Sequence, residues 1–333
     1  MRFGLFCLPA ECPGHRPSAA ETYAGLVDAA VEAERLGLHA VWFAEHHFSP
    51  YGGFIPSIPV LGAAVAARTE RIRIGSAATV LPLRDAVETA ESFAMLDVLS
   101  GGRVEVGVGR GFLPAEFAGR GVAMTDRAGL FTEGLAVLRG AWADGPLRFR
   151  GEHYDLEGVD VLPKPAQRPG PPVWIAASTS RDSFELAGRE GLGLMVNPYN
   201  RSAEELAAGL GWYREARRAA GLDPEGGRIL ANQHLFVAPT ETEAATVPRE
   251  PLMEYLGAVD AAFGRPLTPP DYAAVYPEKV LFGTPDTVTR KIKEWERLGI
   301  TDLCLMTRFG SLAPAAASGS LRLFAREVAP CFG

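Results

Sequence analysis

Residues 72–108, IRIGSAATVLPLRDAVETAESFAMLDVLSGGRVEVGV, contain one complete strand–helix–strand unit. Ile72–Leu81 and Val104–Val108 are short, mainly apolar runs, which predict strands buried on both faces. The segment 85–99 between them is predicted to be a helix that ends at the Ser-Gly-Gly sequence after it. Because units of this kind connect parallel strands, the sequence predicts an α/β fold.

This alternation of strands and helices is repeated along the whole chain. A doubly wound open sheet would give the same local patterns, so the number of strands decides between the two folds. A count of eight favours a single (β/α)8 TIM barrel, which typically needs about 250 residues. We therefore expect residues 1–333 to form one barrel domain. The predicted strands are 3–8, 40–44, 72–81, 104–108, 173–177, 192–196, 229–237 and 302–306.

Two proline-rich stretches interrupt the alternation. Residues 145–172 follow the fourth predicted helix, and residues 240–278 follow the seventh predicted strand. In a barrel, an insertion after a strand lies over the mouth where active sites form. Residues 240–278 are therefore a candidate active-site lid, with a packed surface excursion as the alternative.

Composition and charge argue against several kinds of partner and site. The net charge is −7 and the basic residues are scattered, which argues against nucleic acid or an anionic membrane surface as a partner. The sequence shows no secretory signal and no apolar stretch of roughly 20 residues, the length that spans a bilayer. Its four cysteines form no C-x-x-C pair and no zinc-type cluster. We expect a soluble cytoplasmic protein without a metal centre.

A pair of histidines follows the second predicted strand, in the run Glu45-His46-His47. Neighbouring side chains on a strand point to opposite faces, so the two histidines should not share a metal ion. One of them can instead face the barrel mouth and act as an acid or base near neutral pH. Two ordinary structural histidines are the alternative.

An anion site is indicated by residues at neighbouring strand ends. Arg110 follows the fourth strand among glycines whose spacing does not fit dinucleotide binding. Ser178-Thr179-Ser180 precede a helix, where hydroxyls and unpaired N–H groups can bind phosphate. Arg127 could add a second positive charge, and we assign Asp182 to helix capping. A plain helix cap without a ligand is the alternative.

Taken together, these features resemble the bacterial-luciferase-like flavin-dependent monooxygenases. The resemblance implies a (β/α)8 barrel, FMN taken up in reduced form from a separate flavin reductase, O2 as co-substrate, and a homodimer. The motifs occur in the same order over nearly the whole chain. They are Glu45-His46-His47, Gly75-Ser76-Ala77-Ala78 with Val80-Leu81-Pro82, Leu96-Asp97-x-Leu99-Ser100-Gly101-Gly102-Arg103 leading into Gly107-x-Gly109-Arg110-Gly111, and Gly283-Thr284-Pro285.

The resemblance also implies roles for single residues. His46 corresponds to the catalytic histidine that assists oxygen chemistry and proton transfers at the flavin. Ala77 and Ala78 correspond to a non-proline cis peptide beneath the isoalloxazine ring. Gly109 takes the place of the reactive cysteine of light-emitting luciferases, so nothing here supports bioluminescence. The residues that correspond to the FMN phosphate site are Arg110, Phe112 through its backbone, Arg127, Ser178, Thr179 and Ser180.

We therefore predict an FMN-dependent monooxygenase that oxygenates a small organic substrate. A deazaflavin-dependent hydride-transfer enzyme is one alternative, and a non-catalytic flavin-binding or partner subunit is another. Residues near the strand ends suggest an apolar or aromatic pocket with one amide, although residues of these kinds belong to the core more often than to a pocket. These residues are Phe6, Phe48, Phe54, Met195 and Asn197.

Overall fold

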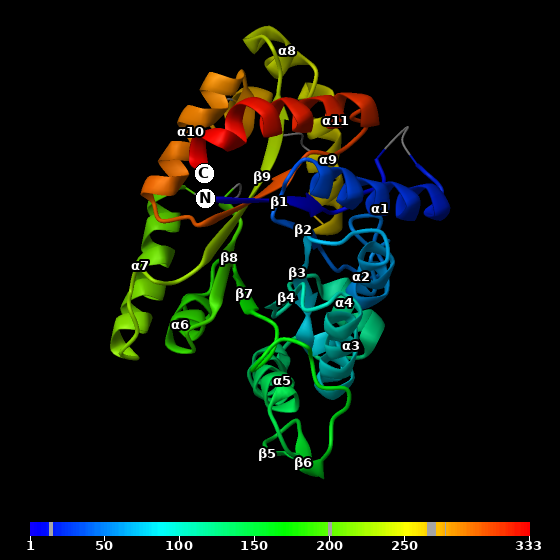
Figure 1. The fold of residues 1–333 in the computed structure, drawn as a ribbon, viewed down its shortest axis with the longest axis vertical. Coiled ribbons are helices and arrows are strands. Elements are labelled where there is room, and N and C mark those ends of the chain that lie inside the picture. The colour runs from blue at the N-terminus through cyan, green and yellow to red at the C-terminus, as the bar shows by residue number, and fades with distance from the viewer. Residues whose placement is uncertain (13–15, 199–201, 265–270, 277) are drawn as a thin grey trace.

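Eight parallel strands close into a barrel in the computed structural model, which describes residues 1–333 except 13–15, 199–201, 265–270 and 277 (Figure 1). The strands follow the order of the chain, and pairing of β11 with β1 closes the ring. This confirms the predicted TIM barrel and excludes the open sheet. The barrel strands are β1 Arg2–Cys7, β2 Ala40–Phe43, β3 Arg73–Val80, β4 Val104–Gly109, β7 Val173–Ala177, β8 Gly193–Val196, β9 Ile229–Val237 and β11 Asp302–Met306.

Helices cover the outside of the barrel, and their starts follow the sequence signals. Ser18 and Ser202 each form a capping box with the glutamate three residues later. Thr284 caps a helix that has proline in its first turn. None of the helices in the described part of the chain has the length and hydropathy needed to cross a bilayer. The covering helices are α1 Ala19–Arg35, α2 Ile58–Ala66, α3 Ala86–Leu99, α5 Arg127–Trp142, α6 Arg181–Arg189, α7 Ala203–Ala219, α10 Pro285–Arg297 and α11 Pro314–Leu323. The short helix α4 Pro114–Arg120 lies instead against the residues that follow β2.

Two tryptophans fill much of the barrel interior. Trp42 on β2 and Trp174 on β7 pack edge to face, with ring centroids 5.6 Å apart. A Cβ atom at Gly75 would collide with the indole of Trp42, and one at Gly193 would collide with that of Trp174. Gly75 therefore makes room for the core and does not support a ligand.

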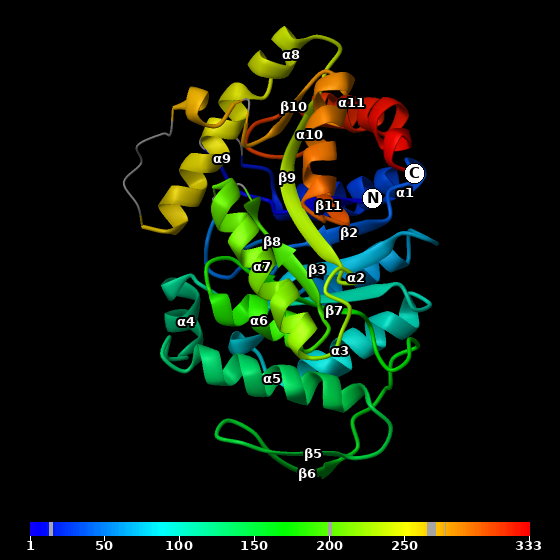
Figure 2. The same ribbon diagram turned by 90° about the vertical axis from the view of Figure 1, so that its left-hand side faces the viewer.

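The insertion at 145–172 forms a hairpin of β5 Leu147–Arg150 and β6 Asp155–Val159, which projects away from the barrel (Figures 1 and 2). The insertion at 240–278 contains helices α8 Glu241–Thr246 and α9 Arg249–Ala262 and a short 3-10 helix, Tyr272–Ala274. The sequence analysis did not predict β10 Leu281–Gly283, which extends the sheet beyond β9.

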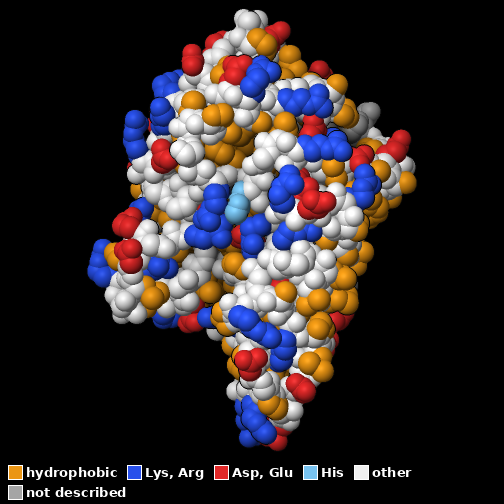
Figure 3. Space-filling view, viewed as in Figure 1, with side chains coloured by type: hydrophobic (Ala, Val, Ile, Leu, Met, Phe, Trp, Pro, Cys, Tyr) orange, Lys and Arg blue, Asp and Glu red, His pale blue; other side chains and the backbone are white. Residues whose placement is uncertain are grey.

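Buried ion pairs close the amino-terminal end of the barrel. The buried carboxylate of Glu105 on β4 contacts Arg73 Nε at 2.6 Å and Arg228 Nη1 at 3.2 Å. Trp174 Nε1 donates to the same carboxylate at 2.7 Å. Arg228 also forms an ion pair with Asp302, with Nη2 2.8 Å from Oδ1. The cluster thus connects the starts of β3, β4, β7 and β11. Figure 3 shows basic side chains gathered around a histidine near the middle of one face of the molecule, with carboxylates among them.

Replacing Glu105 by glutamine is expected to lower the free energy of unfolding. Burial raises the pKa of Glu105, but the imidazole of His39, whose Nε2 is 3.8 Å away, and the charges of Arg228 and Arg73 outweigh this and lower the pKa from 4.5 to about 2. The ionised carboxylate therefore stabilises the fold above pH 4.5. At about 1.4 kcal/mol per pKa unit, a contribution of about 3 kcal/mol is lost as the pH falls towards that lower value.

Urea unfolding of both proteins, from neutral pH down into the acid range, measures this effect. The stability of the glutamine variant should depend less on pH in that range. Equal stability of the two proteins at neutral pH would contradict the role given to Glu105.

Candidate active site

His46 lies just beyond the carboxyl end of β2, at the barrel mouth. Its side chain is buried, and its Nδ1 is 2.9 Å from Glu116 Oε1. The ring of Tyr51 lies 5.0 Å from the imidazole and the ring of Phe112 lies 5.8 Å from it, measured between centroids. Gly52, at φ +74°, brings backbone against the imidazole, where a Cβ would lie 2.6 Å from His46 Cδ2. His46 therefore has a fixed orientation.

Glu116 is a site residue that the sequence analysis missed. It lies on α4, and the same oxygen that contacts His46 also accepts the backbone N–H of His47 at 2.8 Å. Because the carboxylate is buried and accepts from that N–H, it is suited to hold a proton on His46 Nδ1. That arrangement leaves His46 Nε2 as the nitrogen that can take up a proton. The proline at the start of α4 and the left-handed glycine at its end are the signals that could have revealed this helix.

A floor of small residues lies at the same end of the barrel as His46, where β3, β4 and β7 end. The peptide bond between Ala77 and Ala78 is cis, the form that the family resemblance implied. A Cβ at Gly109 would lie 3.6 Å from Ala78 Cβ and 3.5 Å from Ala176 Cβ, so Gly109 leaves a shallow gap between them. Ala77, Ala78 and Ala176 are all partly exposed. Such a surface allows a flat ring to approach the backbone closely.

Arg110 lies at the end of β4, next to this floor. Its Nη1 donates to Ser180 Oγ at 3.3 Å, and its guanidinium lies over the ring of Phe131. Burial lowers the pKa of Arg110, the charge of Arg127 lowers it further, and Asp182 opposes the shift. The positive charge of Arg127, the first residue of α5, therefore acts on Arg110.

The surroundings of Arg110 fit a phosphate group. Its Nε is buried and has no hydrogen-bond partner among the described residues. An unmet buried donor is costly, and an anion would satisfy it. Ser180 is at the N-cap position before α6 but its hydroxyl does not cap the helix, and Ser178 and Thr179 are exposed beside it. Hydroxyls, a helix amino terminus and two guanidiniums are the groups that bind phosphate in proteins.

The capping role predicted for Asp182 is wrong. Ser180 is the residue at the cap position of α6, and Asp182 lies in the first turn, with a largely exposed side chain. Its Oδ2 is 3.9 Å from Arg110 Nη1, at the limit of an ion pair. An exposed pair at this distance contributes little, so Asp182 competes weakly with an anion for Arg110.

The residues predicted to contact substrate lie in different surroundings. Phe6 and Met195 are buried and point into the barrel interior, in the same cluster as the two tryptophans. Phe54 is partly buried, and Asn197 is exposed just after β8. Phe48 is exposed and packs its ring on α4, with a centroid 5.9 Å from Arg120 Cζ.

Helix α9 of the second insertion reaches residues of the mouth. The hydroxyl of Tyr255 is 3.5 Å from that of Tyr51, and Phe263 stacks on Phe112 with ring centroids 5.0 Å apart. Burial raises the pKa of Tyr51, so its hydroxyl keeps its proton at neutral pH. His234, which the sequence analysis missed, lies 5.1 Å from Tyr255 between ring centroids. Burial lowers the pKa of His234 to about 3, so this imidazole is an uncharged part of the wall.

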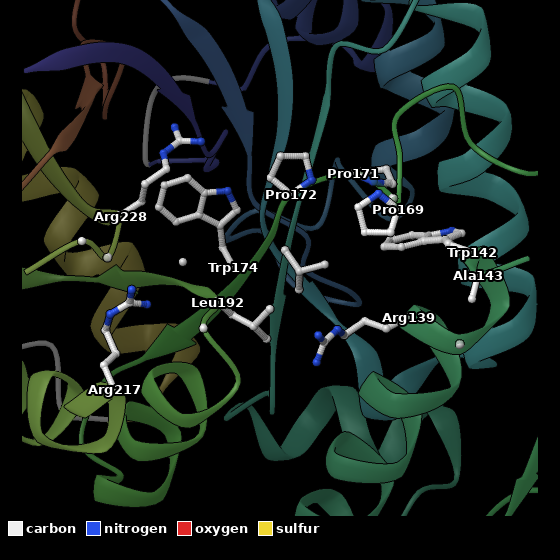
Figure 4. A pocket seen from close by; sticks show the side chains of 17 residues that line it. Arg139, Trp142, Ala143, Pro169, Pro171, Pro172, Trp174, Leu192, Arg217 and Arg228 are labelled. Atoms are coloured by element: carbon white, nitrogen blue, oxygen red, sulfur yellow. The ribbon is translucent and has the colours of Figure 1, made fainter. Parts of the chain in front are cut away.

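A separate cavity of about 660 Å³ opens at the amino-terminal end of the barrel (Figure 4). Trp174 and Arg228 line it, and Arg139 and Arg217 point towards it from α5 and α7. None of the residues that line it in the described part of the chain is a predicted site residue. In TIM-barrel enzymes the active site lies at the opposite, carboxyl-terminal face, so we place the candidate site there and not in this cavity.

Comparison with known proteins gives the family. The family model described as luciferase-like monooxygenase matches residues 1–302. The oxygenase component of flavin-dependent trigonelline monooxygenase from Acinetobacter baylyi is 26% identical, over 100% of this chain and 96% of that protein. The crystal structure of monooxygenase RslO1 from Streptomyces bottropensis has a TM-score of 0.91 and 31% identity, over 100% of both chains.

Other matches are partial or belong to a different cofactor class. Protein y4wF of Sinorhizobium fredii is 41% identical over 57% of this chain, but the match spans only 58% of that protein's length. F420-dependent enzymes are also among the matches. The barrel, the strand-end residues and the match to most of the chain agree: this protein belongs to the luciferase-like monooxygenase family.

Proposed function

We propose that this protein is an FMN-dependent monooxygenase, which binds reduced FMN at the barrel mouth and uses O2 to insert one oxygen atom into a small organic substrate. The observation that carries the proposal is the unmet buried Nε of Arg110, next to a cis peptide floor and within the same mouth as His46. When bound, reduced FMN supplies the electrons for oxygen activation.

Different residues of the chain would bind the phosphate, support the ring and exchange protons. Arg110, Arg127 and the hydroxyls of residues 178–180 hold the phosphate and thereby fix the register of the flavin. Ala77 and Ala78 support the ring. His46, held through Nδ1 by Glu116, exchanges protons at Nε2 with the reacting atoms.

Substrate would lie between this floor and the second insertion. The tyrosine pair and the Phe112–Phe263 stack support a role for residues 240–278 as a lid, since they connect α9 to loops on both sides of His46. A mouth walled by aromatic rings favours an apolar or aromatic substrate. Of the residues predicted to contact it, Phe48 and Asn197 are exposed, whereas Phe6 and Met195 lie in the buried barrel interior. Excluding water there would protect the oxygenation step.

An ¹⁸O₂ experiment tests the proposal. A separate NADH-dependent flavin reductase would supply reduced FMN, and a panel of apolar and aromatic compounds would be offered as substrates. We expect one ¹⁸O atom in the product and oxygen uptake that depends on the substrate. Failure of the protein to bind reduced FMN, or product formation without incorporated ¹⁸O, would contradict the proposal.

A deazaflavin-dependent hydride transfer is the second candidate. The F420-dependent matches favour it, and the phosphate site around Arg110 fits either cofactor. This alternative needs no oxygen. Anaerobic turnover with reduced F420, together with none with reduced FMN, would decide for it.

We also infer that two copies of the chain associate through α2 and α3, which pack against each other. Their outer faces expose Val60, Met95, Val98 and Leu99, each more than half exposed. Exposed apolar patches of this kind mark interfaces. Sedimentation should give a dimer, and Val98→Asp with Leu99→Asp should shift it to a monomer, whereas a wild-type monomer would contradict the inference.

A further inference from the structure

The second histidine of the pair, His47, is enclosed by charged groups. Its side chain is 2% exposed, and its Nε2 lies 3.0 Å from Glu45 Oε1. Its Nδ1 lies 3.4 Å from Nη2 of Arg120, the last residue of α4. Glu45 Oε1 also accepts from Arg84 Nε at 2.8 Å. A chain of contacts therefore runs from Arg84 through Glu45 and His47 to Arg120.

The direction of these hydrogen bonds follows from the chemistry of arginine. A guanidinium only donates, so His47 Nδ1 must accept and cannot carry a proton. The proton of the neutral imidazole then lies on Nε2 and is donated to Glu45. A proton added at Nδ1 would face the positive charge of Arg120, with the nitrogens 3.4 Å apart.

The charges of the whole cluster agree with a neutral His47. Glu45 and Glu116 supply two negative charges, and Arg84 and Arg120 supply two positive charges. The cluster is therefore balanced when both histidines are neutral. His46 can accept a further proton because its ring lies against the carboxylate of Glu116. The unprotonated nitrogen of His47, Nδ1, already accepts from Arg120.

Phe48 explains how Arg120 is kept in place. Phe48 has φ +56°, a conformation that bulky residues rarely adopt, and its exposed ring lies over the guanidinium. Gly119 lets the ring come close, since a Cβ there would lie 2.6 Å from a carbon of that ring. A cation–π contact at an exposed site contributes about 0.5–1 kcal/mol. The exposed Phe48 ring therefore contacts Arg120 and also the imidazole of His47, whose centroid is 5.7 Å away.

We propose that Arg120 is a positioning residue that keeps His47 neutral, so that His46 alone takes up protons during turnover. The inference rests on the proposed function for its role in turnover, but not for the protonation state of His47. Without the guanidinium, Nε2 of His47 would still donate to Glu45, but Nδ1 would no longer face a positive charge or a donor from Arg120. It would then take up a second proton and compete with His46.

Nitrogen NMR of ¹⁵N-histidine-labelled protein tests this without flavin or substrate. The signals of the two residues can be assigned with H46Q and H47Q. In the wild-type protein we expect His47 as the neutral Nε2–H tautomer near neutral pH. In Arg120→Met we expect loss of that tautomer's signal and its replacement by the imidazolium, whereas Arg120→Lys should keep the wild-type signal. Arg68→Met, at an exposed pair with Asp28, is the matched control.

Two results would overturn the proposal: an imidazolium at His47 in the wild-type protein, or a neutral His47 in Arg120→Met. Arg120→Leu, which also lacks a donor, gives the same readout if the methionine variant folds poorly. In the activity assay, the pH profile of turnover should gain one ionisation in Arg120→Met and none in Arg120→Lys. An inactive wild-type enzyme would refute the monooxygenase but leave the NMR result intact, so the two failures can be told apart.

Discussion

Replacing Arg110 by methionine is expected to weaken the binding of reduced FMN about a hundredfold while leaving riboflavin binding nearly unchanged. Riboflavin has the same ring as FMN but no phosphate, so only FMN should lose an interaction. A charge-assisted hydrogen bond contributes about 1.5–3 kcal/mol, and each 1.4 kcal/mol is a factor of about ten in affinity. Anaerobic titration of each protein with both reduced flavins measures the effect.

The control for this variant is Arg181→Met. Arg181 begins α6 next to the proposed phosphate site, but its side chain pairs with Glu185 at 2.7 Å and is mostly exposed. The Arg181→Met substitution should therefore change the affinity for reduced FMN little. If Arg110→Met weakened FMN and riboflavin equally, the arginine would support the fold or the ring and not the phosphate.

The second large effect is expected at His46. His46→Gln should lower the turnover number about 10²–10⁴-fold, the range typical of general acid–base catalysis, while the affinity for reduced FMN changes little. Glutamine can still reach Glu116 with its amide but cannot exchange a proton near neutral pH. Steady-state turnover and anaerobic flavin titration on the same preparation separate the two quantities.

Two further variants make the His46 result specific. His153→Gln, in the loop between β5 and β6, removes a histidine away from the mouth and should keep wild-type turnover. Glu116→Gln keeps an acceptor oxygen for His46 Nδ1 but removes the charge that favours a proton there, so its turnover should lie between the wild type and His46→Gln. Wild-type turnover in His46→Gln would remove this residue from the catalytic role.

The sequence predicted the barrel well because each strand carries its own local signal. Runs such as Val104–Val108 and Asp302–Met306 are apolar apart from one acidic residue each, Glu105 and Asp302, and the capping residues Ser18 and Ser202 mark where helices begin. The strand β10 was missed because it has only three residues, Leu281–Gly283, and pairs with the end of β9. A segment that short has too few positions to show a period.

The site was predicted only in part, because its partners come from different elements. His46, Arg110 and the Ala77–Ala78 pair lie at strand ends, where function concentrates in this fold. Glu116 and Arg120 were missed because they act through contacts about 70 residues away along the chain, on a helix too short to predict with confidence from periodicity. The capping role given to Asp182 was wrong because Ser180 and Asp182, which are two positions apart, both suit a helix start.

A crystal structure of the protein soaked with FMN under reducing conditions tests the central claim most directly. The account predicts the phosphate within hydrogen-bond distance of Arg110 and Ser180, the ring over the Ala77–Ala78 peptide, and His46 Nε2 directed at the ring. Flavin bound instead in the cavity lined by Trp174 and Arg228, or at the mouth with its phosphate away from Arg110, would contradict it.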